Sequence, residues 1–156
     1  MSSVLRYLEF LSLGTWVGSI LYLSFVVAPG AFAILSSRYQ AGAVVGMALG
    51  RLHLLGLIAG VVYLVARVGV ARSLKALAGP AALAVILMLV LTLVSQYGVS
   101  ARMAHLRTEM GSVDSTPQNH PLRVEFNRLH RTSVRLEGAI LLLGLVALFL
   151  TVRNHR

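Results

Sequence analysis

ALAGPAALAVILMLVLTLVSQYGVSA, residues 76–101, contains no charged side chain and decides the fold. A helix that crosses the hydrocarbon core of a bilayer needs about 20 such apolar residues. Three further apolar runs occupy residues 10–35, 39–66 and 138–152, and most charges lie between them. A water-soluble domain of 156 residues cannot bury this much apolar sequence. The pattern therefore predicts four membrane spans.

Composition supports the same class, with 57% hydrophobic and 12% charged residues. The runs are continuous rather than alternating, which favours helices over the strands of a membrane barrel. We therefore expect an all-α integral membrane four-helix bundle, with a long connection between helices 3 and 4. Residues 1–156 should form one domain. The predicted helices cover about residues 4–35, 39–69, 76–107 and 122–153.

The net charge of +9 is not distributed like that of a nucleic-acid-binding protein. The arginines flank the apolar runs, which is typical of side chains that meet lipid headgroups. The expected partner is the lipid bilayer, with no nucleic acid. Lysine and arginine counts on the two sides of the membrane are equal. The short basic flanks at both termini favour a cytoplasmic location for both ends.

Glycines recur at helical spacing in the first two spans. Gly14 and Gly18 lie four residues apart, as do Gly46 and Gly50, and Gly56 and Gly60. Small residues on one face let helices approach closely in lipid, so these six are candidate packing positions. The same faces could instead leave space for a flat cofactor or another ligand. They could also dock on a second copy of the chain or on other membrane subunits.

Two charged residues lie within the predicted second and fourth helices. Arg51 lies sixteen residues before Arg67, and Glu137 lies sixteen before Arg153. At 1.5 Å per residue, both lie about 24 Å from the same interface. Because these two helices run in the same direction, we predict an Arg51–Glu137 ion pair or hydrogen bond, with Tyr22 of the first helix near that level.

Such a pair has two interpretations. It could be a clamp that fixes the register between helices 2 and 4, which is the best-attested use of buried pairs. It could also be a polar site for a proton, an anion or a headgroup. We predict a buried polar core of Arg51, His53, Glu137 and Tyr22.

Histidines supply a second hypothesis. His53 follows the glycine face of helix 2, while His130 shares a face of helix 4 with Glu137. With His105 of helix 3, they belong to the end of the bundle that carries the long connection. Neutral imidazole suits copper, zinc or haem iron, so His53, His130 and His105 are candidate metal or haem ligands. The alternative is that they hydrogen-bond neighbouring helices. No His-x-x-His or Glu-x-x-His spacing occurs, and the chain lacks cysteine.

Catalytic signatures are absent from the sequence. There is no Gly-x-Ser-x-Gly, no phosphate-binding glycine loop, no dinucleotide fingerprint and no pair of carboxylates. We predict no catalytic residue, and a non-enzymatic role is favoured over catalysis.

Four short stretches carry a resemblance to known proteins. They are Trp16-Val17-Gly18, Val27–Phe32, Gly50-Arg51-Leu52-His53 and Phe126–Val134. The chain resembles an uncharacterised family of small bacterial four-helix membrane proteins akin to the mammalian transmembrane protein linked to cisplatin resistance. It is distantly similar to the copper-resistance-D and membrane protoporphyrinogen-oxidase families.

The resemblance implies a four-helix bundle in a bacterial inner membrane and, more remotely, copper or haem as a cofactor. The oxidase relatives place a haem-ligand histidine in their first helix, and this first span has none. Three functions follow: support of metal or haem handling through the polar core, an accessory or structural subunit that docks through its glycine faces, or a membrane oxidoreductase. The third lacks motif support.

Overall fold

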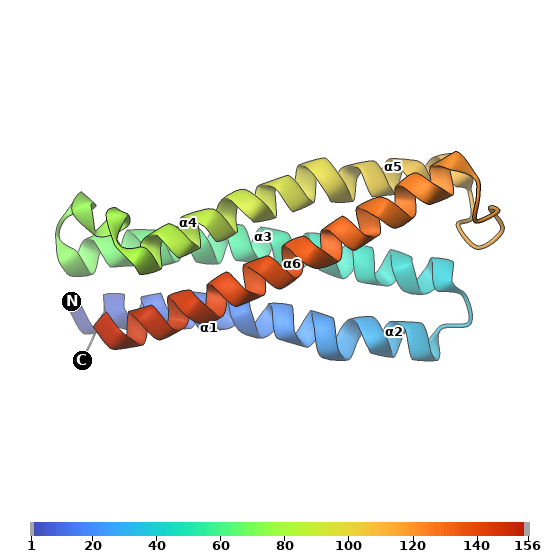
Figure 1. The fold of residues 1–156 in the computed structure, drawn as a ribbon. Coiled ribbons are helices and arrows are strands. Elements are labelled where there is room, and N and C mark those ends of the chain that lie inside the picture. Colours follow the sequence, from blue (N-terminus) through green and yellow to red (C-terminus); the bar gives the residue numbers. More distant parts are fainter. Residues whose placement is uncertain (1, 155–156) are drawn as a thin grey trace.

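The computed structural model describes residues 2–154 and forms four antiparallel helical rods (Figure 1). The first rod joins α1 (Ser2–Tyr22), the π-helix η1 (Leu23–Val27) and α2 (Ala28–Ile34). The second is α3 (Arg38–Ala71), which the short 3₁₀ helix η2 (Leu74–Ala78) follows. The third joins α4 (Pro80–Leu93), the π-helix η3 (Val94–Ser100) and α5 (Ala101–Met110). The fourth is α6 (Pro121–Asn154). The predicted all-α four-helix bundle is confirmed, with the long connection at residues 111–120.

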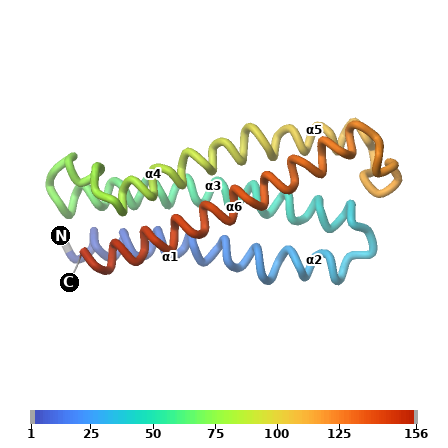
Figure 2. Tube along the Cα trace, viewed as in Figure 1, coloured from blue at the N-terminus to red at the C-terminus, as the bar shows by residue number. Residues whose placement is uncertain are grey.

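The rods are packed so that each contacts two or more others. The start of α1 and the end of α6 lie at the same end of the bundle as the turn between α3 and α4 (Figure 2). The α2–α3 turn and the α5–α6 connection lie at the opposite end. Helix α6 crosses the bundle diagonally, from beside α5 to beside α1 (Figure 1). This crossing brings its middle against α4 and η3.

Local sequence explains the main helix ends. The Ser37 side chain accepts hydrogen bonds from the backbone N–H groups of Tyr39 and Gln40 and so caps α3. Helix α4 begins at Pro80, where the missing N–H costs nothing. We expected this helix to begin at residue 76. Residues 74–78 instead form a separate 3₁₀ turn, because Gly79 is extended and interrupts the helix.

The surface identifies the surrounding solvent as lipid. Large apolar side chains point outward along every rod; Phe25 is 71% exposed and Phe149 65%. Four segments, Ser3–Ile34, Arg38–Ala71, Pro80–Met110 and Pro121–Asn154, are long and apolar enough to cross a membrane. The protein is therefore an integral membrane protein in contact with the bilayer.

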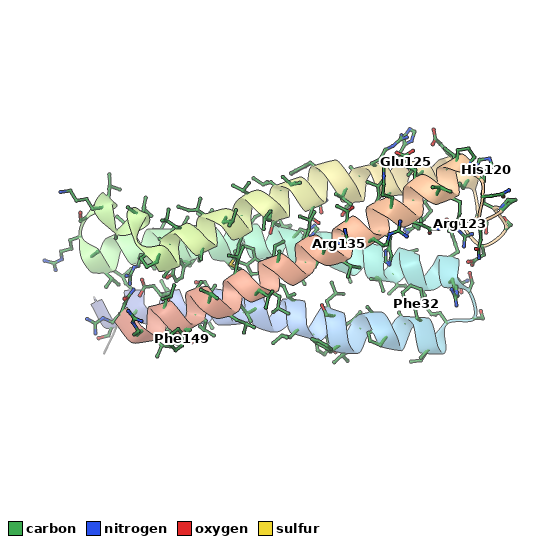
Figure 3. All side chains as sticks on the ribbon, viewed as in Figure 1. Phe32, His120, Arg123, Glu125, Arg135 and Phe149 are labelled. Atoms are coloured by element: carbon green, nitrogen blue, oxygen red, sulfur yellow. The ribbon has the colours of Figure 1, made fainter. Side chains whose placement is uncertain are left out.

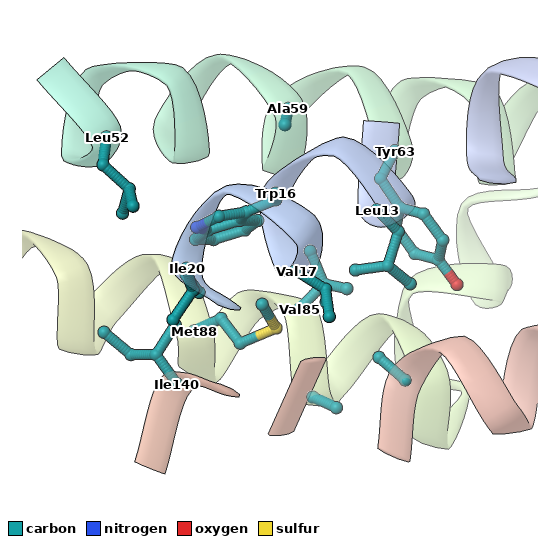
Figure 4. Packing of buried hydrophobic residues seen from close by; sticks show 12 residues of the cluster. Leu13, Trp16, Val17, Ile20, Leu52, Ala59, Tyr63, Val85, Met88 and Ile140 are labelled. Carbon is teal, nitrogen blue, oxygen red and sulfur yellow. The ribbon is translucent and has the colours of Figure 1, made fainter. Parts of the chain in front are cut away.

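The apolar core lies inside the bundle and has residues from all four rods (Figure 4). Trp16 is fully buried, and its indole fills the space that Gly56 and Gly60 of α3 leave open. On α6, Gly144 similarly faces Val17 and Met88. These close approaches are the kind of packing that holds helices together in lipid. They also fix the position along the bundle axis at which the polar groups of α3 and α6 contact one another.

Candidate functional site

A histidine at the middle of α3 forms the centre of the candidate site. His53 is 1% exposed, and both of its ring nitrogens have partners. Nε2 lies 2.7 Å from Oε1 of Glu137 on α6. Nδ1 lies 2.6 Å from Oε1 of Gln96 on η3. The imidazole therefore joins the second, third and fourth rods inside an apolar bundle.

The π-helix η3 supplies two neighbouring polar residues to this centre. Ser95 is fully buried, and its hydroxyl donates to Oε1 of Glu137 over 3.2 Å, while Gln96 binds the other side of the ring. A π-turn is wider than an α-turn, so consecutive side chains diverge less around the helix axis. Single π-turns often occur at functional sites. We call His53, Ser95, Gln96 and Glu137 the polar centre.

The hydrogen bonds restrict where protons can lie in the polar centre. The Gln96 oxygen only accepts, so Nδ1 of His53 carries a hydrogen and donates it. Nε2 then either accepts from a protonated Glu137 or donates to its carboxylate. Both arrangements have the same net charge. Losing this shared proton leaves a negative charge in a low-dielectric interior, and gaining a second proton leaves a positive one.

The predicted Arg51–Glu137 contact is wrong. Within residues 2–154, the ion-pair partner of Glu137 is His53, and Arg51 is exposed. Counting residues did predict that this part of α3 lies at the same depth as Glu137 of α6. The error is in the direction of the side chain, because residues two apart on a helix point about 200° apart. His53 faces the bundle, so Arg51 faces outward.

The predicted burial of Arg51 and Tyr22 is also wrong, although both line one groove. Tyr22 is 61% exposed. Both line a groove of about 530 Å³ between α1 and α3. A second groove of about 360 Å³ adjoins it, and Arg51 and Thr15 line both. The predicted polar core thus separates into buried His53 with partly buried Glu137, and exposed Arg51 and Tyr22.

The three candidate metal ligands do not converge. His105 is exposed and lies 3.4 Å from Glu109 of its own helix, and His130 is exposed on α6. Both nitrogens of His53 already form hydrogen bonds, so neither has a lone pair directed at free space. Across residues 2–154, no group of three histidine, cysteine or acidic side chains is placed to hold a metal ion. These residues do not fit copper or haem.

The six predicted packing glycines have three different environments. Gly56 and Gly60 pack against Trp16. Gly46 instead lies beside the guanidinium of Arg107, at an ordinary contact distance, and this guanidinium also lies over the ring of Phe126 at 5.7 Å from its centroid. The remaining three face open space, with no atom within 4 Å of an added Cβ: Gly14, Gly18 and Gly50.

Charged residues gather at the end that carries the α5–α6 connection. Figure 3 shows His120, Arg123 and Glu125 there, with Arg135 further along α6. Arg102 of α5 binds Glu125 through two contacts of 2.9 and 3.1 Å. This pair joins α5 to α6 where both helices extend beyond their apolar runs.

Three polar residues of the interior were not predicted: Ser95, Gln96 and Glu9. Glu9 is fully buried near the start of α1, with an oxygen 3.5 Å from Nη1 of Arg67. A usable signal existed for Ser95 and Gln96, since they are adjacent polar residues inside the charge-free run of residues 76–101. For Glu9 the signal was weaker, because it immediately precedes the first apolar run and reads as a flanking charge.

These features define a four-helix integral membrane protein with a polar centre buried in its bundle. Residues 11–112 match the family described as Domain of unknown function (DUF4149), and the chain belongs to that family. The matched region contains His53, Ser95 and Gln96, while Glu137 lies beyond it. No curated protein sequence matches the chain, and no solved structure does. The links to cisplatin-resistance and copper-resistance-D proteins stay predictions.

Proposed function

We propose that the protein is a non-enzymatic integral membrane protein that works by taking up and releasing a proton at the His53–Glu137 pair. The observation that carries this proposal is the 2.7 Å contact between a buried imidazole and a carboxyl group inside an apolar bundle. Ionisable residues within membrane spans are costly and commonly form proton relays. Replacing a buried pair by apolar residues of similar volume is often neutral for stability, so stability alone does not account for the pair.

The two hydrogen-bond partners support a reversible proton site. Gln96 holds the ring in one tautomer, with Nε2 turned to Glu137. The hydroxyl of Ser95 donates to the same carboxyl oxygen and so stabilises negative charge on it. The polar centre therefore contains a hydroxyl group that can donate to the Glu137 carboxylate. It also contains a ring nitrogen, Nε2 of His53, that can accept from protonated Glu137. A purely structural contact does not require both.

A pH titration in detergent micelles tests this proposal. Infrared difference spectra follow the carboxyl group of Glu137, and ¹⁵N NMR follows the ring nitrogens of His53. We expect both signals to change together, and we expect Glu137→Gln to shift the midpoint for His53 while that of the exposed His130 stays unchanged. If neither group changes between about pH 4 and pH 9, the pair is a clamp and the proposal fails.

Docking to other helices is a second candidate function, favoured by the open glycines. Gly14 and Gly18 of α1 leave outward space that no side chain of residues 2–154 fills. A second copy of the chain or another membrane subunit could approach closely there. Native mass measurement in mild detergent tests it, since a dimer that Gly14→Leu disrupts would support docking. A monomer at all protein concentrations would reject self-association.

We also propose a bacterial inner membrane with both termini in the cytoplasm. The lysine and arginine counts at the two ends are equal, so the support is that the basic residues near the termini lie in short flanks: Arg6, Arg67, Arg72, Lys75 and Arg153. Because the chain has no cysteine, single cysteines can report the orientation. A membrane-impermeant maleimide applied to intact cells should label Ser115→Cys and spare Ser73→Cys. The reverse pattern would contradict this orientation.

A further inference from the structure

The groove between α1 and α3 is built from residues other than the polar centre, and it contains an unpaired cation. Arg51 is exposed there, and none of the acidic side chains among residues 2–154 forms an ion pair with it. Its neighbours on α3, Leu54 and Ile58, are 58% and 59% exposed and so face lipid. A guanidinium among such residues needs an anion, because an unpaired charge in hydrocarbon is costly.

We infer that this groove binds one anionic phospholipid of the surrounding bilayer, with its phosphate at Arg51 and one acyl chain along the adjoining apolar groove. Arg51 lies at the junction of the two grooves, since it lines both. A guanidinium binds phosphate through two parallel N–H···O contacts, which gives both strength and orientation. The cation therefore fixes where the headgroup of the lipid lies.

The two grooves lie at different positions along the bundle, and this decides which part of a lipid each holds. The larger one, of about 530 Å³, extends from Arg51 toward the end with the α2–α3 turn, and its lining includes Ser19 and Tyr22, whose hydroxyl groups can donate to phosphate oxygens. The smaller one, of about 360 Å³, is lined by Ser12 and Thr15 and by apolar side chains, among them Leu54 and Ile58. It extends toward the end of the bundle that holds Arg67. A headgroup fits the first groove and an acyl chain the second.

The depth of Arg51 agrees with this assignment. Sixteen residues separate it from Arg67, which corresponds to about 24 Å along α3. The hydrocarbon core is about 30 Å thick, so Arg51 lies close to the boundary opposite Arg67. The long side chain can reach the phosphate level there. The smaller groove then lies toward the middle of the bilayer, where acyl chains are.

Native mass spectrometry in mild detergent tests the inference with two added lipids, dioleoylphosphatidylglycerol and dioleoylphosphatidylcholine. We expect one tightly retained phosphatidylglycerol per chain and weaker retention of phosphatidylcholine. Arg51→Leu should weaken phosphatidylglycerol binding about tenfold, since it removes hydrogen bonds to a charged group. Arg135→Leu is the matched control, because Arg135 is exposed on α6, outside the groove. It should leave that affinity unchanged.

A steric pair of variants makes the test independent of charge. Gly18 lines the larger groove and Gly14 does not, and neither has an atom within 4 Å of an added Cβ. Gly18→Leu should therefore fill the groove without disturbing the fold and abolish lipid retention, whereas Gly14→Leu should retain the lipid. The inference is overturned if Arg51→Leu binds phosphatidylglycerol like the parent chain. It is also overturned if Arg135→Leu loses as much, or if the groove is occupied by a second copy of the chain, seen as a dimer that Arg51→Leu abolishes.

Discussion

His53 and Glu137 lie 2.7 Å apart across α3 and α6, while Arg51, two residues before His53, faces outward. Helix α3 therefore directs a titratable imidazole into the bundle and a permanently charged guanidinium toward the lipid. The two groups lie at nearly the same position along the helix axis. The two polar groups of α3 therefore serve different sites. Their separation makes the predictions for each independent.

Coupling between His53 and Glu137 is the first prediction. Replacing either residue by alanine leaves the other buried without its partner, which should cost about 1–3 kcal/mol in the free energy of unfolding. Replacing both should cost less than the sum of the two single changes, with a coupling energy of about 1–3 kcal/mol. Reversible unfolding in mixed micelles measures all three variants.

Arg51 provides the control for this double-mutant cycle. Because Arg51 and Glu137 do not contact one another, Arg51→Ala and Glu137→Ala should be additive within about 0.5 kcal/mol. Additivity in the His53–Glu137 cycle, or strong coupling in the Arg51–Glu137 cycle, would contradict the arrangement of α3 described above.

Close packing at Trp16 gives the second prediction. A Cβ added to Gly56 would overlap the indole nitrogen of Trp16, so Gly56→Ala should lower stability by about 1–3 kcal/mol. Gly50→Ala on the same helix is the matched control, since no atom lies within 4 Å of its added Cβ. Thermal unfolding in detergent compares the two, and equal effects would show that the overlap is not the cause.

A hydrogen bond between the second and fourth rods gives the third prediction. The Tyr63 hydroxyl lies 2.7 Å from Oγ1 of Thr151, which itself donates to the carbonyl oxygen of Ala147. Tyr63 is therefore the donor, and Tyr63→Phe should cost about 1 kcal/mol. Tyr97→Phe changes a tyrosine that is 71% exposed and should leave the midpoint of unfolding where it is. A loss as large for Tyr97→Phe would instead point to a general effect of the hydroxyl group.

Much of the fold follows from the sequence because lipid makes helix length and composition decisive. The charge-free run at residues 76–101 and its three counterparts predicted the number of rods, and counting from Arg67 and Arg153 predicted that α3 and α6 meet near residues 51–53 and 137. Counting residues measures height along a helix. It does not decide which of two polar residues faces inward, and this choice depends on how α3 is rotated by the packing of Trp16 against Gly56.

The rest of the site could not be derived because it depends on a local change of helix type. Regular α-helical geometry separates Ser95 from Gln96 by about 100° around the axis, so only one of them would be assigned to a site. The π-helix over Val94–Ser100 brings both to Glu137 and His53. The same limitation explains why His53, His105 and His130 were predicted to converge. They lie toward the same end of the bundle, but their side chains do not point toward one another.

The tautomer of His53 provides the last prediction and the sharpest test of the polar centre. Gln96 is the acceptor for the hydrogen on Nδ1, so Gln96→Leu removes the reason for that tautomer. We expect the hydrogen to move to Nε2 while the shared proton stays on Glu137, whose carbonyl oxygen can then accept from Nε2, and ¹⁵N NMR of the ring distinguishes the two forms. Ser95→Ala is the matched control on the same π-helix, because it removes a donor to Glu137 and leaves the Gln96 contact intact. If the hydrogen stays on Nδ1 in Gln96→Leu, the amide of Gln96 does not determine the tautomer of His53. In that case Glu137 alone orients the ring and its proton.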